Sequence, residues 1–182
     1  MTPDPATAAA RLLADYEERY GVPRTPPIPI DEIARAHLLL WVELADDLRL
    51  VPGAPGAAGR LSGLLIPSER TIWVDRHEAE RSAGRRRFTT AHEVGHWVLH
   101  AQGSAAGDSV FCRPNDLHRT DHLEGEANAF AASLLMPEPL LRPAADASGC
   151  NIAHLAQRFD VSAPAMKLRL LRLDLLPPWM RA

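Results

Sequence analysis

Two histidines four residues apart, with a glutamate directly after the first, form the part of the sequence best suited to chemistry. The stretch FTTAHEVGHWVLH, residues 88–100, contains His92, Glu93 and His96. Four residues advance an α-helix by about 40° beyond one turn, so both imidazoles project from one face. Imidazoles at this spacing can bind one zinc ion, and Glu93 can act as general base toward a water that zinc activates.

Glu93 also has a structural explanation. Thr90-Ala91-His92-Glu93 matches a capping box, in which the glutamate would mark the start of a helix. The preceding GRRRFTT argues against a helix start here, because Arg, Phe and Thr are compatible with a helix and Gly84 is a better boundary. We therefore favour the metal-binding interpretation.

A catalytic zinc needs three protein ligands and one open position. His100 continues the four-residue series, but it lies too far along the helix axis to share an ion with His92 and His96. We interpret His100 as a surface histidine or one that supports a ligand. The third ligand must then come from another segment.

A second helical segment, DHLEGEANAFAASLLMP, supplies two acids, Glu124 and Glu126. Its apolar face is defined by Leu123, Phe130 and Leu134, and Glu126 lies on or beside that face. A carboxylate that points into a core needs a partner, and zinc would provide one. Glu126 is therefore the expected third ligand. Glu124, turned about 200° away, is expected to be solvated or to lie behind the ligands.

Together, RRRFTTAHEVGHWVLH and EGEANAFAASLLMP resemble the paired helices of the ImmA/IrrE family of zinc metallopeptidases. The resemblance implies a gluzincin-like centre with one zinc ion per chain, held by His92, His96 and Glu126, with Glu93 as the catalytic base. It also implies a substrate class, namely a DNA-binding transcriptional repressor linked to phage or stress responses and encoded nearby. Cleavage of that repressor would switch its operon on.

Two features depart from the family pattern. Many relatives carry an N-terminal helix-turn-helix domain, where this chain has one short helix. Related gluzincins use a Tyr or His to stabilise the oxyanion, and the only tyrosines here, Tyr16 and Tyr20, lie in that N-terminal helix. The candidate substitutes are His118, Arg119 and His122. The candidates for orienting the ligand imidazoles are Asp116, Asp121 and Asn128.

The elements that must position these residues predict an α+β fold, in which a small β-sheet packs on a helical metallopeptidase core. The expected elements are helices over residues 7–21 and 30–37, strands over 38–44, 60–66 and 71–75, a helical stretch over 75–101 with a break near Gly84, a long helix over 121–137, and a helical tail. An irregular loop is expected over 103–120. We divide the chain into a metallopeptidase domain, 1–148, and a helix-turn-helix-like tail, 149–182, packed on it.

The tail lacks the side chains of a DNA reader. Its last helix opens Ala163-Pro164-Ala165-Met166, which offers no base-reading group, and its later leucines are apolar on nearly every side. We expect packing or partner docking there, and no direct DNA binding. The net charge of −3 gives no global argument for nucleic-acid or membrane binding.

The chain has no basic leader followed by an apolar run, and its two cysteines cannot form a disulfide framework. A cytoplasmic location is expected. Our interpretation is a zinc metalloendopeptidase that acts on a protein substrate away from membranes. The alternative is a regulatory protein-binding module or antitoxin with little or no turnover, which the missing tyrosine leaves open.

Overall fold

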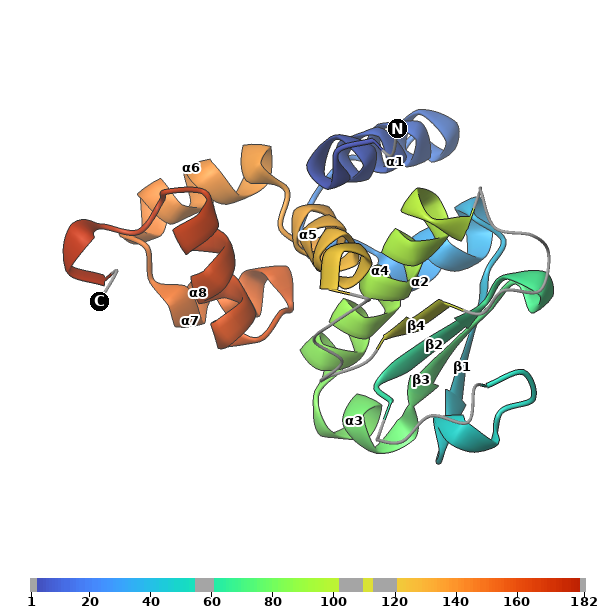
Figure 1. Cartoon of the computed structure of the whole chain (residues 1–182). Coiled ribbons are helices and arrows are strands. Elements are labelled where there is room, and N and C mark those ends of the chain that lie inside the picture. The colour runs from blue at the N-terminus through green and yellow to red at the C-terminus, as the bar shows by residue number, and fades with distance from the viewer. Residues whose placement is uncertain (1–2, 55–60, 102–109, 113–120, 181–182) are drawn as a thin grey trace.

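The computed structural model describes residues 3–54, 61–101, 110–112 and 121–180. A four-stranded sheet lies against helix α4, helices α5 and α1 lie beyond α4, and three shorter helices form a tail to one side (Figure 1). The helices are α1 (Pro5–Tyr20), α2 (Ile30–Glu32), α3 (Arg76–Arg81), α4 (Ala83–Leu99), α5 (Asp121–Leu135), α6 (Glu138–Ser148), α7 (Ile152–Phe159) and α8 (Ala163–Arg172). A π-helical turn, Ile33–His37, continues α2. This architecture confirms the predicted α+β class.

The sheet has the strand order β1-β3-β2-β4. Its strands are β1 (Trp41–Ala45), β2 (Gly63–Ile66), β3 (Thr71–Asp75) and β4 (Val110–Cys112). β2 and β3 form the predicted antiparallel hairpin, whereas β1 runs parallel to β3. β4 pairs with the other edge of β2 and lies inside the stretch that was expected to be an irregular loop. The rest of that loop lies outside the described residues.

Strand β2 is buried on both faces, because the sheet separates two apolar clusters. Leu65 belongs to the main core, which also contains residues of α1, α4, α5 and the tail. Leu64 and Ile66 point to the other side and pack with Leu48 and Val51 in a second, smaller cluster. Side chains alternate across a strand, so β2 contributes to both cores at once.

Helices α4 and α5 pack closely at Gly95. A Cβ atom at Gly95 would stand 3.1 Å from Cδ1 of Phe130 and 3.2 Å from the Cα and carbonyl oxygen of Ala127. A side chain at this position would force the α5 backbone or Phe130 to move by a few tenths of an ångström, so the glycine favours this close approach of α5 to α4. The approach brings the polar residues of α5 within reach of the histidines on α4.

We expect Gly95→Ala to be less stable than Gly125→Ala by about 1–3 kcal/mol, because overpacking forces neighbours out of place. Gly125 is the matched control, since it lies in α5 and a Cβ there would meet no described atom within 4 Å. Both changes gain the same intrinsic helix propensity, so the difference isolates the α4–α5 contact. Urea unfolding of both variants measures it, and equal stabilities would contradict this packing.

The tail contacts the beginning of α4. Gly84 lies against the backbone of Val161 and Ser162, which join α7 to α8. The Arg87 guanidinium donates to the carbonyl oxygen of Asp160 at 3.1 Å and to that of Ile28 at 2.7 Å. The helix that carries the histidine motif is therefore tied to the turn of the tail.

The predicted helix pair is present in the tail, but its second helix is less buried than expected. Leu170 and Leu176 belong to the core, whereas Leu168 and Leu171 are 48% and 43% exposed. Packing therefore accounts for part of this helix, and the expected partner docking of the rest stays a prediction. None of the described helices is both long enough and apolar enough to cross a bilayer.

Candidate metal centre

Helix α4 positions the histidine motif in its interior. The helix begins after Ser82, whose Oγ accepts a hydrogen bond from the backbone N–H of Arg85, and Glu93 lies well inside it. The capping-box explanation of Glu93 is therefore excluded. His92, Glu93 and His96 are each at most 1% exposed.

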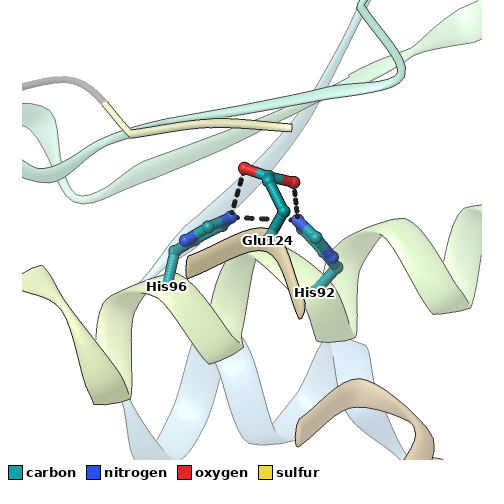
Figure 2. Close-up of side chains that lie close together, drawn as sticks. All are labelled: His92, His96 and Glu124. Carbon is teal, nitrogen blue, oxygen red and sulfur yellow. Dashed lines mark hydrogen bonds and ion pairs between the residues drawn. The ribbon is translucent and has the colours of Figure 1, made fainter. Parts of the chain in front are cut away.

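The two imidazoles converge with one carboxylate from the neighbouring helix. Nε2 of His92 lies 2.9 Å from Nε2 of His96. Glu124 lies across both rings, with Oε2 3.1 Å from Nε2 of His92 and Oε1 3.3 Å from Nε2 of His96 (Figure 2). The ligand atoms of all three side chains lie within 4.8 Å of one another, and no other such group of three occurs among the described residues.

The carboxylate beside the histidines is that of Glu124, which corrects the sequence-based expectation for Glu126. Oε2 of Glu126 lies instead 3.0 Å from Nε2 of His100 and 3.5 Å from Nδ1 of His122. Glu124 was expected to be solvated or to lie behind the ligands, yet its side chain is only 14% exposed. The two acids of α5 have exchanged the roles that the sequence suggested.

The error came from the choice of the apolar face. Leu123 was used to define that face, but it is 43% exposed. The buried face runs through Ala127 and Ala131, and Glu124 precedes these by three and seven residues, which places it on the same face. Close helix packing selects small residues, so alanines rather than leucines mark this contact.

Asn128 holds the ring of His92 from behind. Nδ1 of His92 lies 3.0 Å from Oδ1 of Asn128. An amide oxygen only accepts, so the ring donates its Nδ1–H and leaves the lone pair of Nε2 directed toward His96 and Glu124. Of the three residues proposed to orient the ligands, Asn128 is the one that the structure brings to the site. Asp116 and the side chain of Asp121 lie outside the described residues.

The charge states of the site suit metal binding. Burial lowers the pKa of His96 below its ordinary value, so the ring is neutral at pH 7. Burial raises the pKa of Glu124, but the rings of His92 and His96 that lie across its carboxylate outweigh this effect and lower the pKa to about 2. Neutral imidazole and ionised carboxylate are the forms that bind a metal.

The donor set fits a zinc ion. Two imidazole nitrogens and one glutamate oxygen form the ligand set of several zinc peptidases, which leaves a fourth position open. Ligand atoms around a tetrahedral zinc lie about 3.4 Å apart. The two imidazole nitrogens lie 2.9 Å apart, and each lies 3.1 Å or 3.3 Å from a different oxygen of Glu124, so all three side chains are close enough to bind one ion.

The carboxylate of Glu93 is buried without a hydrogen-bond partner. No described residue donates to either of its oxygens, and the side chain has no exposed surface. Burial, and to a lesser degree the negative charge of Glu124, raise the pKa of Glu93 well above its ordinary value. An isolated buried carboxylate is costly, and a divalent cation nearby would lower both the cost and the pKa.

None of the candidates for the oxyanion-stabilising group lies beside the three converging side chains in the described part of the chain. His118 and Arg119 lie outside the described residues. The His122 side chain is 84% exposed at the start of α5, beside Glu126. Neither tyrosine takes the role in this structure, because Tyr16 is buried in the main core and the Tyr20 hydroxyl donates to the carbonyl oxygen of Ala36 at 2.6 Å.

A small sheet packed on a helix with two histidines, joined by an acid from the next helix, is an arrangement of the metallopeptidase class. The chain belongs to the family of the IrrE N-terminal-like domain, a metallopeptidase family whose model matches residues 55–171. The predicted family resemblance is thereby confirmed.

Two known proteins are similar to this chain, one over about two thirds of its length and the other over nearly all of it. The radiation response metalloprotease IrrE of Deinococcus radiodurans is 31% identical over 131 residues, which are 65% of this chain and 38% of that protein. The solved structure of a Mycobacterium tuberculosis transcriptional regulator matches 98% of this chain and 49% of its own, with a TM-score of 0.63 and 22% identity. This chain therefore spans less than half of either protein, and the second likeness concerns the fold alone.

Proposed function

We propose that this chain is a zinc metalloendopeptidase in which His92, His96 and Glu124 bind the ion and Glu93 is the general base. One observation carries the proposal: two imidazole nitrogens and an ionised carboxylate converge beside a second, unpartnered carboxylate buried in the same site. Without a cation, this arrangement concentrates acceptors and negative charge, and no described residue donates a hydrogen bond to the Glu93 carboxylate.

Each residue has a defined part in the hydrolysis of a peptide bond. When bound, zinc supplies Lewis acidity, which lowers the pKa of a water ligand and polarises the substrate carbonyl. Glu93 takes the proton of the attacking water and delivers it to the leaving amine nitrogen. Asn128 keeps the His92 ring in the tautomer that directs Nε2 toward the ion.

The proposed substrate is a DNA-binding transcriptional repressor encoded near this protein, cut at one site in the cytoplasm during a phage or stress response. Membership of the IrrE N-terminal-like family and the similarity to a protein named as a radiation response metalloprotease support a protein substrate and a link to a stress response.

The test is to incubate the purified full chain, stripped of metal, with repressor proteins encoded beside its gene, with and without one equivalent of zinc. Mass spectrometry of the products should find a single cut that requires zinc, stops with a chelator and resumes when zinc is restored. Cleavage that persists in the metal-free protein would contradict the proposal, as would intact substrates in every zinc-loaded reaction.

A second candidate function is a regulatory binding module with little turnover. It is favoured by one observation: both tyrosines are engaged away from the site in the described part of the chain. This candidate predicts stable zinc-loaded complexes with an intact repressor, measured by size-exclusion chromatography. The peptidase predicts that such complexes are converted to fragments.

Strand β2 also constrains the general base. A Cβ at Gly63 would stand 2.5 Å from Oε1 of Glu93 and 2.6 Å from Cγ2 of Thr89. We expect Gly63→Ala to displace the Glu93 carboxylate and to lower kcat roughly 10²-fold, because small misplacements of a catalytic group are costly. Zinc affinity should stay unchanged, since Gly63 contacts no proposed ligand. Full activity in this variant would contradict the assigned role of Glu93.

A further inference from the structure

His100 and Glu126 extend a chain of polar contacts from one of the proposed zinc ligands. His100 follows the last residue of α4, one turn beyond His96. Nδ1 of His100 lies 3.0 Å from Nδ1 of His96, and Nε2 of His100 lies 3.0 Å from Oε2 of Glu126. The side chains of His100 and Glu126 are 8% and 19% exposed, so these polar contacts are largely shielded from water.

Hydrogen-bond chemistry fixes where each proton lies. The Glu126 carboxylate accepts only, so Nε2 of His100 carries a proton and donates it. In a His100 ring that carries one proton, Nδ1 is then an acceptor, and Nδ1 of His96 is the donor toward it. The remaining nitrogen of His96, Nε2, keeps its lone pair. This nitrogen is the one that faces His92 and Glu124.

We propose that His100 and Glu126 are positioning residues, which form a relay that holds His96 in the tautomer able to bind zinc. The inference rests on the proposed metal centre for its function, but the tautomer itself is a property of the protein alone. Such outer partners orient a ligand imidazole and raise its basicity.

The two proposed histidine ligands are held by different means. His92 is supported by one neutral amide, that of Asn128. His96 contacts the imidazole of His100, which in turn contacts the carboxylate of Glu126. This carboxylate places a negative charge behind the proposed ligand. A charged acceptor makes a stronger hydrogen bond than a neutral one, so the relay gives His96 the greater electron donation.

Glu126 has a second neighbour that serves as a control. Nδ1 of His122 lies 3.5 Å from Glu126, but its side chain is 84% exposed. A role of Glu126 in pairing with His122 would be electrostatic and screened by water. Removing His122 should therefore leave the relay unchanged.

The experiment combines histidine NMR of the metal-free protein at pH 8 with zinc affinity measured by competition with a chromophoric chelator. Two-bond proton–nitrogen spectra of nitrogen-15-labelled protein report which ring nitrogen carries the proton. We expect Nδ1–H for His96 and Nε2–H for His100 in the natural protein. His100→Phe should give His96 a mixture of tautomers.

Zinc affinity supplies the second readout. His100→Phe and Glu126→Ala should each weaken it about 10- to 100-fold, as removal of outer partners does at other metal sites. Glu126→Gln should recover part of the loss, because its amide oxygen accepts the same hydrogen bond without the charge. His122→Ala should bind zinc like the natural protein.

A purely structural tie between α4 and α5 would give a different outcome. Glu126→Ala and His100→Phe would then lower the melting temperature but leave the His96 tautomer and the zinc affinity unchanged, which would overturn the relay. Neither readout needs peptide cleavage. If the expected shifts occurred in a protein that cut no substrate, the relay would stand and only the proposed peptidase function would fail.

Discussion

Replacing Glu124 by alanine is expected to weaken zinc binding more than a hundredfold, which is a loss of more than about 2.8 kcal/mol. The change removes the one carboxylate that lies across both imidazoles, at 3.1 Å and 3.3 Å from their Nε2 atoms. Two histidines alone are an incomplete set for a zinc site of this type. Chelator competition, with bound metal counted by mass spectrometry, measures the effect.

Glu126→Ala is the matched control for this prediction, because it removes an acid two residues away on the same helix. It should cost less affinity than Glu124→Ala, since Glu126 contacts His100 rather than the converging nitrogens. If Glu126→Ala lost more zinc than Glu124→Ala, the third ligand would have to be reassigned to Glu126. Circular dichroism of both variants confirms that the helices persist.

Replacing Glu93 by glutamine is expected to leave zinc binding intact and to lower kcat/KM for the cleaved repressor roughly 10²- to 10⁴-fold. An amide of the same shape cannot take up the proton of the attacking water. The fold should be at least as stable as before, because burial raises the pKa of Glu93 and no described residue donates a hydrogen bond to it. Rate measurements, zinc stoichiometry and thermal unfolding check the three parts.

Glu18→Gln is a suitable control for that variant, since it makes the same chemical change at an exposed position of α1. It should change neither the rate nor the metal content. A Glu93→Gln protein that still cleaves its substrate at the natural rate would show that another group performs the proton transfer. A variant that has lost its zinc would show that Glu93 is a ligand instead.

The histidine motif was predictable from sequence because its geometry is local. A helix fixes the relation between His92 and His96 by its own periodicity, whatever surrounds it. The beginning of the helix that carries the motif was also predictable, because Gly84 marked it within two residues. The hairpin of β2 and β3 was found for the same reason, since its two strands are adjacent in sequence.

The acid could not be chosen reliably from sequence, because that choice depends on how two helices approach each other. Gly95, which has no side chain, and Ala127, which has only a methyl group, set the approach, and such small residues leave a weak pattern in a sequence. The large residue Leu123 gave a stronger but misleading signal, since it is largely exposed. The spacing of Glu124 from Ala127 and Ala131 was the signal that would have identified it.

Strand β4 also could not be predicted from the sequence. It has three residues and no partner nearby in sequence, because it pairs with β2 across a long segment of chain. The parallel pairing of β1 with β3 also depends on the tertiary structure, because neither strand's sequence specifies its partner.

The attachment of the tail to the first turns of α4 has a mechanical consequence. The α7–α8 turn packs against Gly84 and accepts a hydrogen bond from Arg87. Both residues lie near the start of α4, which carries His92 and His96 further along. A helix is stiff along its axis, so a displacement of one end also moves the other end. A molecule that binds the tail would therefore act on the same helix that carries the two histidines, and cutting the chain after residue 148 would remove this contact.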